Sequence, residues 1–319
     1  MDFKLSEMQQ DIAKLAKDFA EKELAPTVKE RDEKEVFDRA ILDKMGTLGL
    51  LGIPWEEENG GVGADFLSLA VACEEVAKVD PSIALSFEVH TMLCSWPIWK
   101  FGTPEQKAKF LKPLAEGTKL GAFGLTEPNA GSDAGGTETT AVDKGDYYLL
   151  NGNKIFITNA PIADTYVVFA VTTPGIGTHG ISAFIVEKGW DGFTFGDHYD
   201  KLGIRSSSTA ELIFHDVKVP KENLLGELGQ GFKIAMATLD GGRIGIASQA
   251  LGIAQGAYEE AVAYAKERVQ FGKPIGFQQG ITFKLADMAT KLRAARLLVY
   301  SAAELKQNHE PYSVEAAMA

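Results

Sequence analysis

The chain has 319 residues, 45% of them hydrophobic, and a formal net charge of -12 with an isoelectric point near 5.0. This length is sufficient for two or three domain-sized units, each with a buried core. The acidic balance argues against nucleic acid or an anionic membrane surface as the main partner, and any polyanionic ligand needs a local basic pocket.

Residues 1–119 have the pattern of a helical domain. Ser6 and Gln9 have the spacing of a capping box, and an apolar stripe with helical periodicity follows them. Asp80-Pro81 and Thr103-Pro104 each place a capping residue before a proline at the first helical position. These signals predict several helices in the first third of the chain.

Residues 120–222 change to the period of β-strands. Asn151-Gly152 separates two apolar, aromatic runs, and this dipeptide is typical of a hairpin turn because both turn positions favour positive φ. We therefore predict a hairpin at this point within a β-barrel or sandwich domain. Further strands are expected over residues 165–171, 181–186 and 210–219.

Residues 223–319 return to the helical period. Apolar residues recur every three or four positions over 244–265 and again over 281–302, with a break at Phe271-Gly272-Lys273-Pro274. Residues 311–316 look like the start of another helix, but the chain ends at Ala319 and so short a helix is unstable alone. The expected fold class is thus α+β, with an incomplete C-terminal bundle that exposes its apolar stripes.

The two cysteines, Cys73 and Cys94, stand in apolar, helix-like surroundings without CxxC spacing. This pattern favours free thiols in a reducing compartment over a disulfide framework or a zinc site. The N-terminal stretch is amphipathic and mixed in charge, unlike a signal peptide, and no apolar run is long enough to span a bilayer. We expect a soluble, cytoplasmic protein without a membrane partner.

Gly175 to Gly180 match the G-x-G-x-x-G pattern of dinucleotide-binding sites. That fingerprint must open a helix, whereas here it precedes a predicted strand, so we interpret it as a hairpin loop. The chain also lacks H-E-x-x-H and G-x-S-x-G, and its five histidines are scattered singly. Neither a metal enzyme nor a serine hydrolase is indicated.

The segment Gly124 to Asp133 is a loop rich in hydroxyls, glycine and free backbone N–H groups. Such a loop can donate hydrogen bonds to phosphate oxygens or to a polar ring edge. It can equally be a capped turn in which Ser132 and Asp133 bond their own backbone. The residues alone leave both interpretations open.

Six stretches occur in a specific order along the chain. They are Gly124 to Gly135, Lys154 to Asn159, Lys201 to Ser207, Asp216 to Pro220, Leu239 to Arg243 and Arg268 to Ile275. Together they resemble the acyl-CoA dehydrogenase family over essentially the whole chain. The resemblance is greatest to short-chain, butyryl-CoA-type enzymes of anaerobic bacteria, which also have phenylalanine at the position of Phe156.

The resemblance implies FAD, bound between the β-domain and the bundle and completed by a neighbouring subunit of a homotetramer. The loop is expected to line the flavin and the strand to pack on its other side, with the Thr158 hydroxyl near the reactive nitrogen. Three further residues are expected to reach the partner subunit's FAD. These groups are Phe123, Leu125, Thr126 and Ser132 on the loop; Phe156, Ile157 and Thr158 on the strand; and Arg268, Phe271 and Gln279.

The same resemblance places the acyl-CoA channel along Asp240, Gly241, Gly242 and Arg243, with Ser132 near the CoA part. Adjacent glycines within a helix cost about 1 kcal/mol each relative to alanine, which a close approach of a ligand or helix would justify. The usual catalytic glutamate of the family is expected beyond Ala319. A minority of relatives carry it at the position of Gly242, so no catalytic base is assigned.

The implied reaction is FAD-dependent α,β-dehydrogenation of a short-chain acyl-CoA, with electrons passed to an electron-transferring flavoprotein. Two alternatives stay open at this point. One is an oxygen-using, acyl-CoA oxidase-like flavoenzyme, and the other is an inactive flavin- or CoA-binding scaffold.

Overall fold

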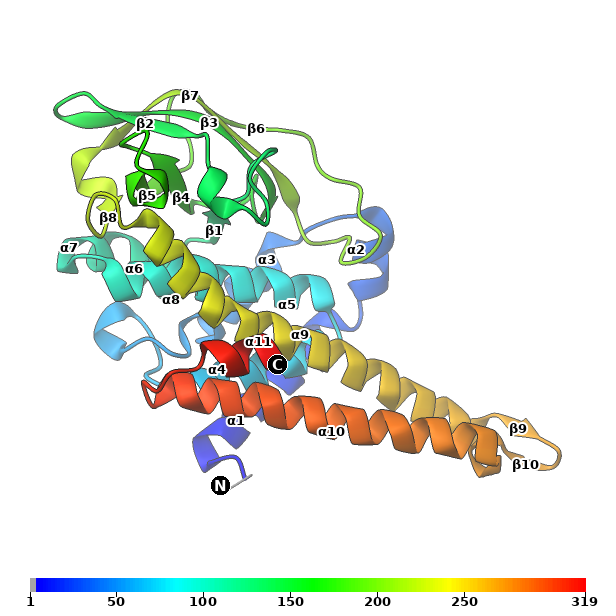
Figure 1. The fold of residues 1–319 in the computed structure, drawn as a ribbon. Coiled ribbons are helices and arrows are strands. Elements are labelled where there is room, and N and C mark those ends of the chain that lie inside the picture. The colour runs from blue at the N-terminus through cyan, green and yellow to red at the C-terminus, as the bar shows by residue number, and fades with distance from the viewer. Residues whose placement is uncertain (1–3) are drawn as a thin grey trace. The chain divides into compact units, whose positions relative to one another are not determined.

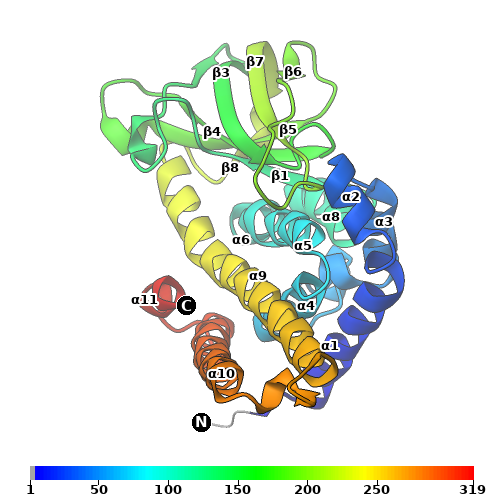
Figure 2. The same cartoon turned by 90° about the vertical axis from the view of Figure 1, so that its right-hand side faces the viewer.

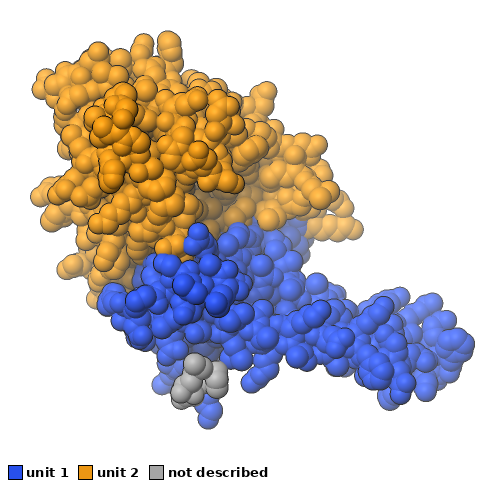
Figure 3. All heavy atoms as spheres, viewed as in Figure 1, with its two compact units in different colours: residues 1–28, 65–84, 243–319 blue, residues 29–64, 85–242 orange. Residues whose placement is uncertain are grey.

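The computed structural model describes residues 4–319 and divides into two compact units (Figure 3). Unit 1 comprises Met1–Val28, Asp65–Ala84 and Arg243–Ala319. Unit 2 comprises Lys29–Ala64 and Leu85–Gly242. Two helices, α5 (Pro81–Glu88) and α9 (Gly231–Glu267), continue from one unit into the other.

Unit 1 is helical, and local capping explains where its helices begin. The predicted capping box of Ser6 and Gln9 is present at the start of α1 (Glu7–Phe19), which continues as a π-helix over Ala20–Leu24. The Gln9 amide also donates to Asp65 Oδ2 at 2.7 Å. Asp65 in turn caps α4 (Phe66–Ala77) by accepting from Ser68 N at 2.6 Å, so α1 is tied to the start of α4.

The second half of unit 1 is a helical hairpin. Helix α9 is joined to α10 (Gln279–Gln307) through the short strands β9 (Val269–Gln270) and β10 (Lys273–Pro274), and the two helices lie side by side (Figures 1 and 2). Helix α11 (Ser313–Met318) follows. The core between these helices and α4 consists of Ala70, Ile244, Leu251, Leu292, Val299, Ala302, Ala303 and Ala316.

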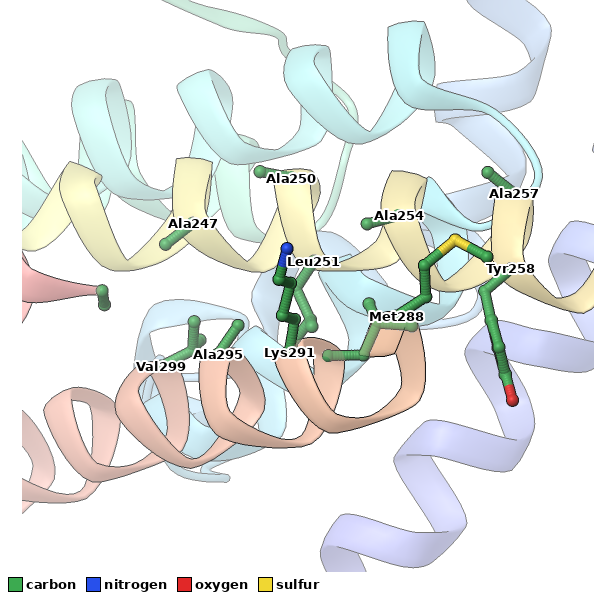
Figure 4. Close-up of a pocket in the computed structure, with 12 residues that line it drawn as sticks. Ala247, Ala250, Leu251, Ala254, Ala257, Tyr258, Met288, Lys291, Ala295 and Val299 are labelled. Carbon is green, nitrogen blue, oxygen red and sulfur yellow. The ribbon is translucent and has the colours of Figure 1, made fainter. Parts of the chain in front are cut away.

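An apolar pocket of about 490 Å³ lies between α9 and α10 (Figure 4). Its walls are mostly alanine on the α9 side, and Met288, Lys291 and Val299 line it from α10. Ala319, the last residue, also lines it. Helix α10 buries only five of its 29 residues. The predicted exposure of the apolar stripes holds only in part: Met288 is exposed, whereas Leu251, Leu292 and Val299 are buried in the core of unit 1.

Unit 2 begins with short helices. The predicted capping box of Thr103 and Gln106 is present, and Gln106 also donates to the carbonyls of Glu222 and Leu224 at 2.7 and 2.8 Å. The elements are α2 (Val28–Lys34), α3 (Arg39–Thr47), the π-helix η4 (Val89–Ser95), α6 (Trp96–Phe101), α7 (Pro104–Gln106), the π-helix η5 (Lys107–Leu111) and α8 (Lys112–Ala115).

The sheet of unit 2 has eight strands in the order β6-β7-β3-β2-β4-β5-β8, with β1 pairing in parallel to β4. Strands β4 and β5 each bury six of their seven residues, as continuous apolar runs predict. The strands are β1 (Gly121–Gly124), β2 (Thr140–Asp143), β3 (Tyr147–Thr158), β4 (Thr165–Val171), β5 (Ile181–Glu187), β6 (Phe193–Phe195), β7 (Thr209–Pro220) and β8 (Leu224–Leu225).

The predicted hairpin turn at Asn151-Gly152 is wrong. Strand β3 runs through both residues, and its register against β7 shifts between Leu150 and Gly152. Gly152 has φ 141, and a Cβ at this position would lie 2.5 Å from Thr139 Oγ1. The glycine therefore serves a β-bulge under close backbone packing, and pairing with β7 overrides the local turn preference.

The G-x-G-x-x-G stretch is confirmed as a connection between strands, because it forms a 3-10 turn (Gly177–Gly180) between β4 and its antiparallel partner β5. Both cysteines are buried free thiols. Across residues 4–319, no helix is both long and apolar enough to cross a membrane.

Candidate functional site

The loop after β1 lies directly against β3. Ile155 N donates to Thr126 O at 2.8 Å, and the Lys154 ammonium donates to Leu125 O at 3.1 Å. Leu125 is buried and Thr126 is half-buried. Two segments about 30 residues apart in sequence thus lie side by side.

Strand β3 is distorted where it borders this loop. Its register against β7 shifts between Lys154 and Ile157, and Phe156 between them has φ 59. A bulky residue with positive φ is unusual and indicates local backbone strain. The bulge leaves the Phe156 ring 61% exposed and 5.0 Å from the ring of Tyr199. β-Bulges that redirect a side chain in this way are frequent beside functional sites.

The end of β3 is fixed by Asn159, which also has positive φ. Its side-chain amide donates to the carbonyls of Ser86 and Gly121 at 3.2 and 3.1 Å, and its backbone N–H donates to Ser208 O at 2.8 Å. Between the two strained positions, Ile157 is buried and Thr158 is half-buried. Phe156 to Thr158 are therefore held on both sides.

A buried ion pair lies beneath the loop. The Lys154 ammonium is 2.6 Å from Glu127 Oε1, and the two side chains are 0% and 4% exposed. Glu127 also accepts the backbone N–H groups of Glu138 and Thr139 at 2.7 and 3.1 Å. Burial lowers the pKa of Lys154 to about 8. For Glu127, burial acts in the opposite direction, but the Lys154 charge and the hydrogen bonds leave its pKa below the usual value.

The sheet-side residues singled out by the sequence lie on β1, on the loop or on β3. Phe123 is buried and packs at 5.1 Å from the ring of Phe169, whereas Ser132 is exposed. The hydrogen bonds that close the loop come from the carboxylate and backbone of Glu127, including a reciprocal backbone pair with Ala130 at 3.1 Å.

Asp240, Gly241 and Gly242 lie on the part of α9 that belongs to unit 2. Gly242 is closely packed, since a Cβ there would lie 2.6 Å from Leu93 Cδ2 and 3.5 Å from Glu88 Oε1. The helical glycine is thus explained by the approach of η4. Arg243, the next residue, is exposed.

Sequence reasoning missed Glu88. It is 4% exposed, its Oε1 has no hydrogen-bond partner within the described residues, and burial raises its pKa to about 8. At neutral pH this side chain is a protonated carboxylic acid next to Gly242. A lone glutamate in an apolar helical run was the available signal.

The hydroxyls of Ser206 and Ser207 were also missed as individual groups. Both side chains are buried, and neither hydroxyl has a hydrogen-bond partner in the part of the chain that the structure describes. Their segment lies beside the end of β3, since the next residue, Ser208, accepts a hydrogen bond from Asn159 N through its carbonyl oxygen. Unpaired buried hydroxyls are costly, and both of these can bond to a polar group placed beside them.

Arg268, Phe271 and Gln279 belong to unit 1, at the connection between α9 and α10. All three are exposed, Phe271 to 93%, and Phe271 has φ 53. The structure therefore does not bring them into one unit with the loop and β3. Within residues 4–319 there is also no group of three or more His, Cys, Asp or Glu able to hold a metal ion.

Comparisons with known proteins cover the whole chain. The family models for the N-terminal, middle and C-terminal domains of acyl-CoA dehydrogenase match residues 6–118, 122–217 and 229–319. The short-chain specific acyl-CoA dehydrogenase of Megasphaera elsdenii is 58% identical over 100% of this chain and 84% of that protein.

Two solved structures have nearly the same fold. Butyryl-CoA dehydrogenase from Megasphaera elsdenii matches with a TM-score of 0.98 and 57% identity, over 100% of this chain and 84% of that one. A chain in a structure of the electron transferring flavoprotein of Acidaminococcus fermentans matches with a TM-score of 0.99 and 60% identity, with the same coverage. The predicted α+β class and the resemblance drawn from the motifs are confirmed: the chain belongs to the acyl-CoA dehydrogenase family.

Proposed function

We propose that this protein is an FAD-dependent dehydrogenase of short-chain acyl-CoA thioesters. It converts a butyryl-CoA-like substrate to the trans-2-enoyl-CoA and passes the electrons to an electron-transferring flavoprotein. The observation that carries the proposal is the strained bulge of β3, which exposes the Phe156 ring beside the loop of Leu125 and Thr126. Its family membership and its relatives, a butyryl-CoA dehydrogenase among them, support the substrate class.

The residues present fit a flavin. The exposed Phe156 ring offers an aromatic face, and the half-buried hydroxyls of Thr126 and Thr158 offer donors to a polar ring edge. The unpaired Ser206 and Ser207 hydroxyls add two buried polar groups nearby. We assign Phe123, Leu125, Thr126, Ser132, Phe156, Ile157 and Thr158 to this side of the cofactor. When bound, FAD accepts a hydride equivalent from the substrate Cβ.

The residues of the α9–α10 connection suit a second role in a homotetramer. Arg268 carries a planar guanidinium that can donate two hydrogen bonds to a pyrophosphate at once. Phe271 exposes 93% of its surface and Gln279 is also exposed, so both are accessible to another subunit. We assign the three residues to the partner subunit's FAD.

Asp240, Gly241, Gly242 and Arg243 are assigned to the acyl-CoA channel. The α-proton of a thioester is weakly acidic, so hydrogen bonds to the thioester carbonyl must stabilise the developing enolate. Glu127 is unsuited to act as the base, because its carboxylate is occupied by Lys154 and two backbone N–H groups. Burial raises the pKa of Glu88 to about 8 and so favours its protonated form, and we assign it no role in the reaction.

The domain organisation is proposed as a helical domain (1–119), a β-domain (120–222) and a helical bundle (223–319). The two buried free thiols are compatible with a reducing compartment, and we propose a cytoplasmic location.

An anaerobic visible spectrum of the purified protein, before and after butyryl-CoA is added, tests the proposed function. We expect a bound flavin whose absorbance is lost on addition of butyryl-CoA and returns when an electron-transferring flavoprotein is supplied. Absence of bound flavin after incubation with FAD would contradict the cofactor assignment. Reduction by long-chain but not short-chain thioesters would contradict the substrate class.

A further inference from the structure

The Glu127–Lys154 pair has no part in the chemistry proposed above, yet it lies between the two segments assigned to the flavin. We infer that this buried pair is a positioning device: it sets the spacing between the loop of Leu125–Thr126 and the bulge at Phe156, and thereby the affinity and reduction potential of the flavin. The inference rests on the proposed function.

Lys154 connects the loop to the bulge of β3. Lys154 belongs to β3, two residues before Phe156, and its ammonium holds Leu125 O at 3.1 Å and Glu127 Oε1 at 2.6 Å. Both acceptors belong to the loop, on either side of Thr126. One side chain therefore holds the backbone around Thr126 at a fixed distance from the bulge.

The Glu127 carboxylate also holds the loop from its other side. Glu127 accepts the N–H groups of Glu138 and Thr139, which lead into β2. Strand β2 pairs with β3 in antiparallel register. The loop, β2 and β3 thus form a closed hydrogen-bonded circuit whose centre is the ion pair.

Burial makes the Glu127–Lys154 pair costly in free energy. Two charges removed from water have a large desolvation cost, and well-packed apolar residues of the same volume are often as stable or more stable. Lys154 is 0% exposed, so this cost is present here. A pair of this kind is a poor device for stability alone, but its directional bonds fix a geometry that apolar contacts do not.

Three variants separate positioning from stability. Lys154→Met keeps the hydrocarbon volume but removes the ammonium, and Glu127→Gln keeps an acceptor oxygen for the N–H groups of Glu138 and Thr139. The double variant E127Q/K154M leaves no unpaired charge. Lys221→Met is the control, because it breaks an exposed pair of the same unit, Lys221–Asp143 at 2.5 Å.

For each variant, thermal unfolding of the apoprotein is measured with the Kd for FAD by fluorescence quenching and the midpoint potential of the bound flavin. We expect K154M to bind FAD at least about tenfold more weakly, the effect of losing one buried charged hydrogen bond. In the double variant we expect apoprotein stability to recover towards wild type, while the Kd stays weakened and the midpoint potential stays shifted. The control K221M should change neither the Kd for FAD nor the midpoint potential.

If the double variant has the wild-type Kd and midpoint potential, the pair is a replaceable part of the core and the inference is overturned. The double variant decides this even if K154M fails to fold, because it carries no unpaired buried charge. Wild-type protein that binds no FAD overturns both the inference and the proposed function. Wild-type protein that binds FAD, with variants that bind it equally well, overturns the inference alone.

Discussion

The two groups of assigned residues, one on the sheet of unit 2 and one on the helical hairpin of unit 1, differ in how deeply their surroundings are buried. Strand β4 buries six of its seven residues, whereas α10 buries five of 29. The sheet-side residues are bound to their neighbours by hydrogen bonds of this chain. In the connection between α9 and α10, Phe271 is 93% exposed. Away from this connection, a pocket of about 490 Å³ opens between the two helices.

The two regions differ in how far hydrogen bonds within this chain fix the assigned residues. The loop and the β3 bulge are held by a closed circuit of internal bonds, so their geometry does not require another molecule. The assigned residues of the α9–α10 connection, Arg268, Phe271 and Gln279, are exposed in this chain. Substitutions in the sheet should therefore lower the free energy of unfolding, whereas substitutions at exposed residues of the hairpin should leave it nearly unchanged.

The largest expected effect on stability comes from the sheet core. Phe169→Ala removes a ring that is 0% exposed and packs on Phe123 at 5.1 Å, and we expect a loss of about 3–5 kcal/mol in the free energy of unfolding. Phe283→Ala on α10 removes a ring that is 62% exposed and should change stability by less than about 0.5 kcal/mol. Chemical denaturation measures both, and similar losses would abolish the contrast between the regions.

The second prediction concerns the packing of α9 against α4 in unit 1. A Cβ at Gly252 of α9 would lie 2.4 Å from Glu74 O and 2.7 Å from Ala77 Cβ, so Gly252→Ala should cost about 1–3 kcal/mol by overpacking against α4. A Cβ at Gly280 meets nothing within 4 Å, and Gly280→Ala should stabilise α10 by up to about 1 kcal/mol. Thermal unfolding of the two variants provides the measurement. A stabilising Gly252→Ala would mean that α9 and α4 are not in close contact.

Local signals in the sequence predicted local structure well. The capping boxes at Ser6 and Thr103 depend on residues three positions apart, and both are present. The hairpin expected at Asn151-Gly152 failed, because β3 pairs with β7 more than 50 residues later and that pairing decides its course. A turn preference within four residues cannot report such a partner.

For the candidate site, the motifs marked the two segments that the structure places side by side, Leu125–Thr126 and Lys154–Thr158. The burial of Lys154 against Glu127 could not be read from the chain, since each residue alone is typical of a solvated surface. Glu88 stands in an apolar helical run, but its surroundings could not be read from the chain either, since its neighbour Gly242 lies more than 150 residues away. Long-range packing, rather than residue type, gives these side chains their properties.

The third prediction concerns pH. Burial raises the pKa of Glu88 from 4.5 to about 8 and lowers the pKa of His90 from 6.5 to about 4. Burial favours the neutral form of His90, whose Nδ1 accepts from Gly121 N–H at 3.0 Å while Nε2 donates to the Leu114 carbonyl at 3.1 Å; this second bond opposes the lowering of the pKa. Between pH 4.5 and 6.5, folding takes up a proton at Glu88 and releases one at His90, so the two effects cancel.

Between pH 6.5 and 8 only Glu88 contributes, and there the folded state holds a proton that the unfolded state releases. Stability should therefore fall as pH rises, by up to about 1.4 kcal/mol per pH unit. Glu88→Gln should flatten this part of the profile, and His90→Gln should make the fall begin near pH 4.5 instead. Unfolding free energies of wild type and both variants across this range provide the test. Parallel profiles for wild type and Glu88→Gln would show that Glu88 ionises normally.

The smallest expected effect on stability is in the connection between α9 and α10. A substitution there should instead change the Kd for FAD. Phe271→Ala removes a ring that is 93% exposed at a residue with φ 53, so stability should change by less than about 0.5 kcal/mol. If this residue reaches the partner subunit's FAD, as proposed, the Kd for FAD should nevertheless rise at protein concentrations where the oligomer forms. Phe277→Ala, 71% exposed in the same connection, is the matched control and should leave the Kd unchanged. Equal Kd values for wild type and both variants would mean that the connection has no part in the flavin site. The site would then be formed without residues from a partner subunit's α9–α10 connection.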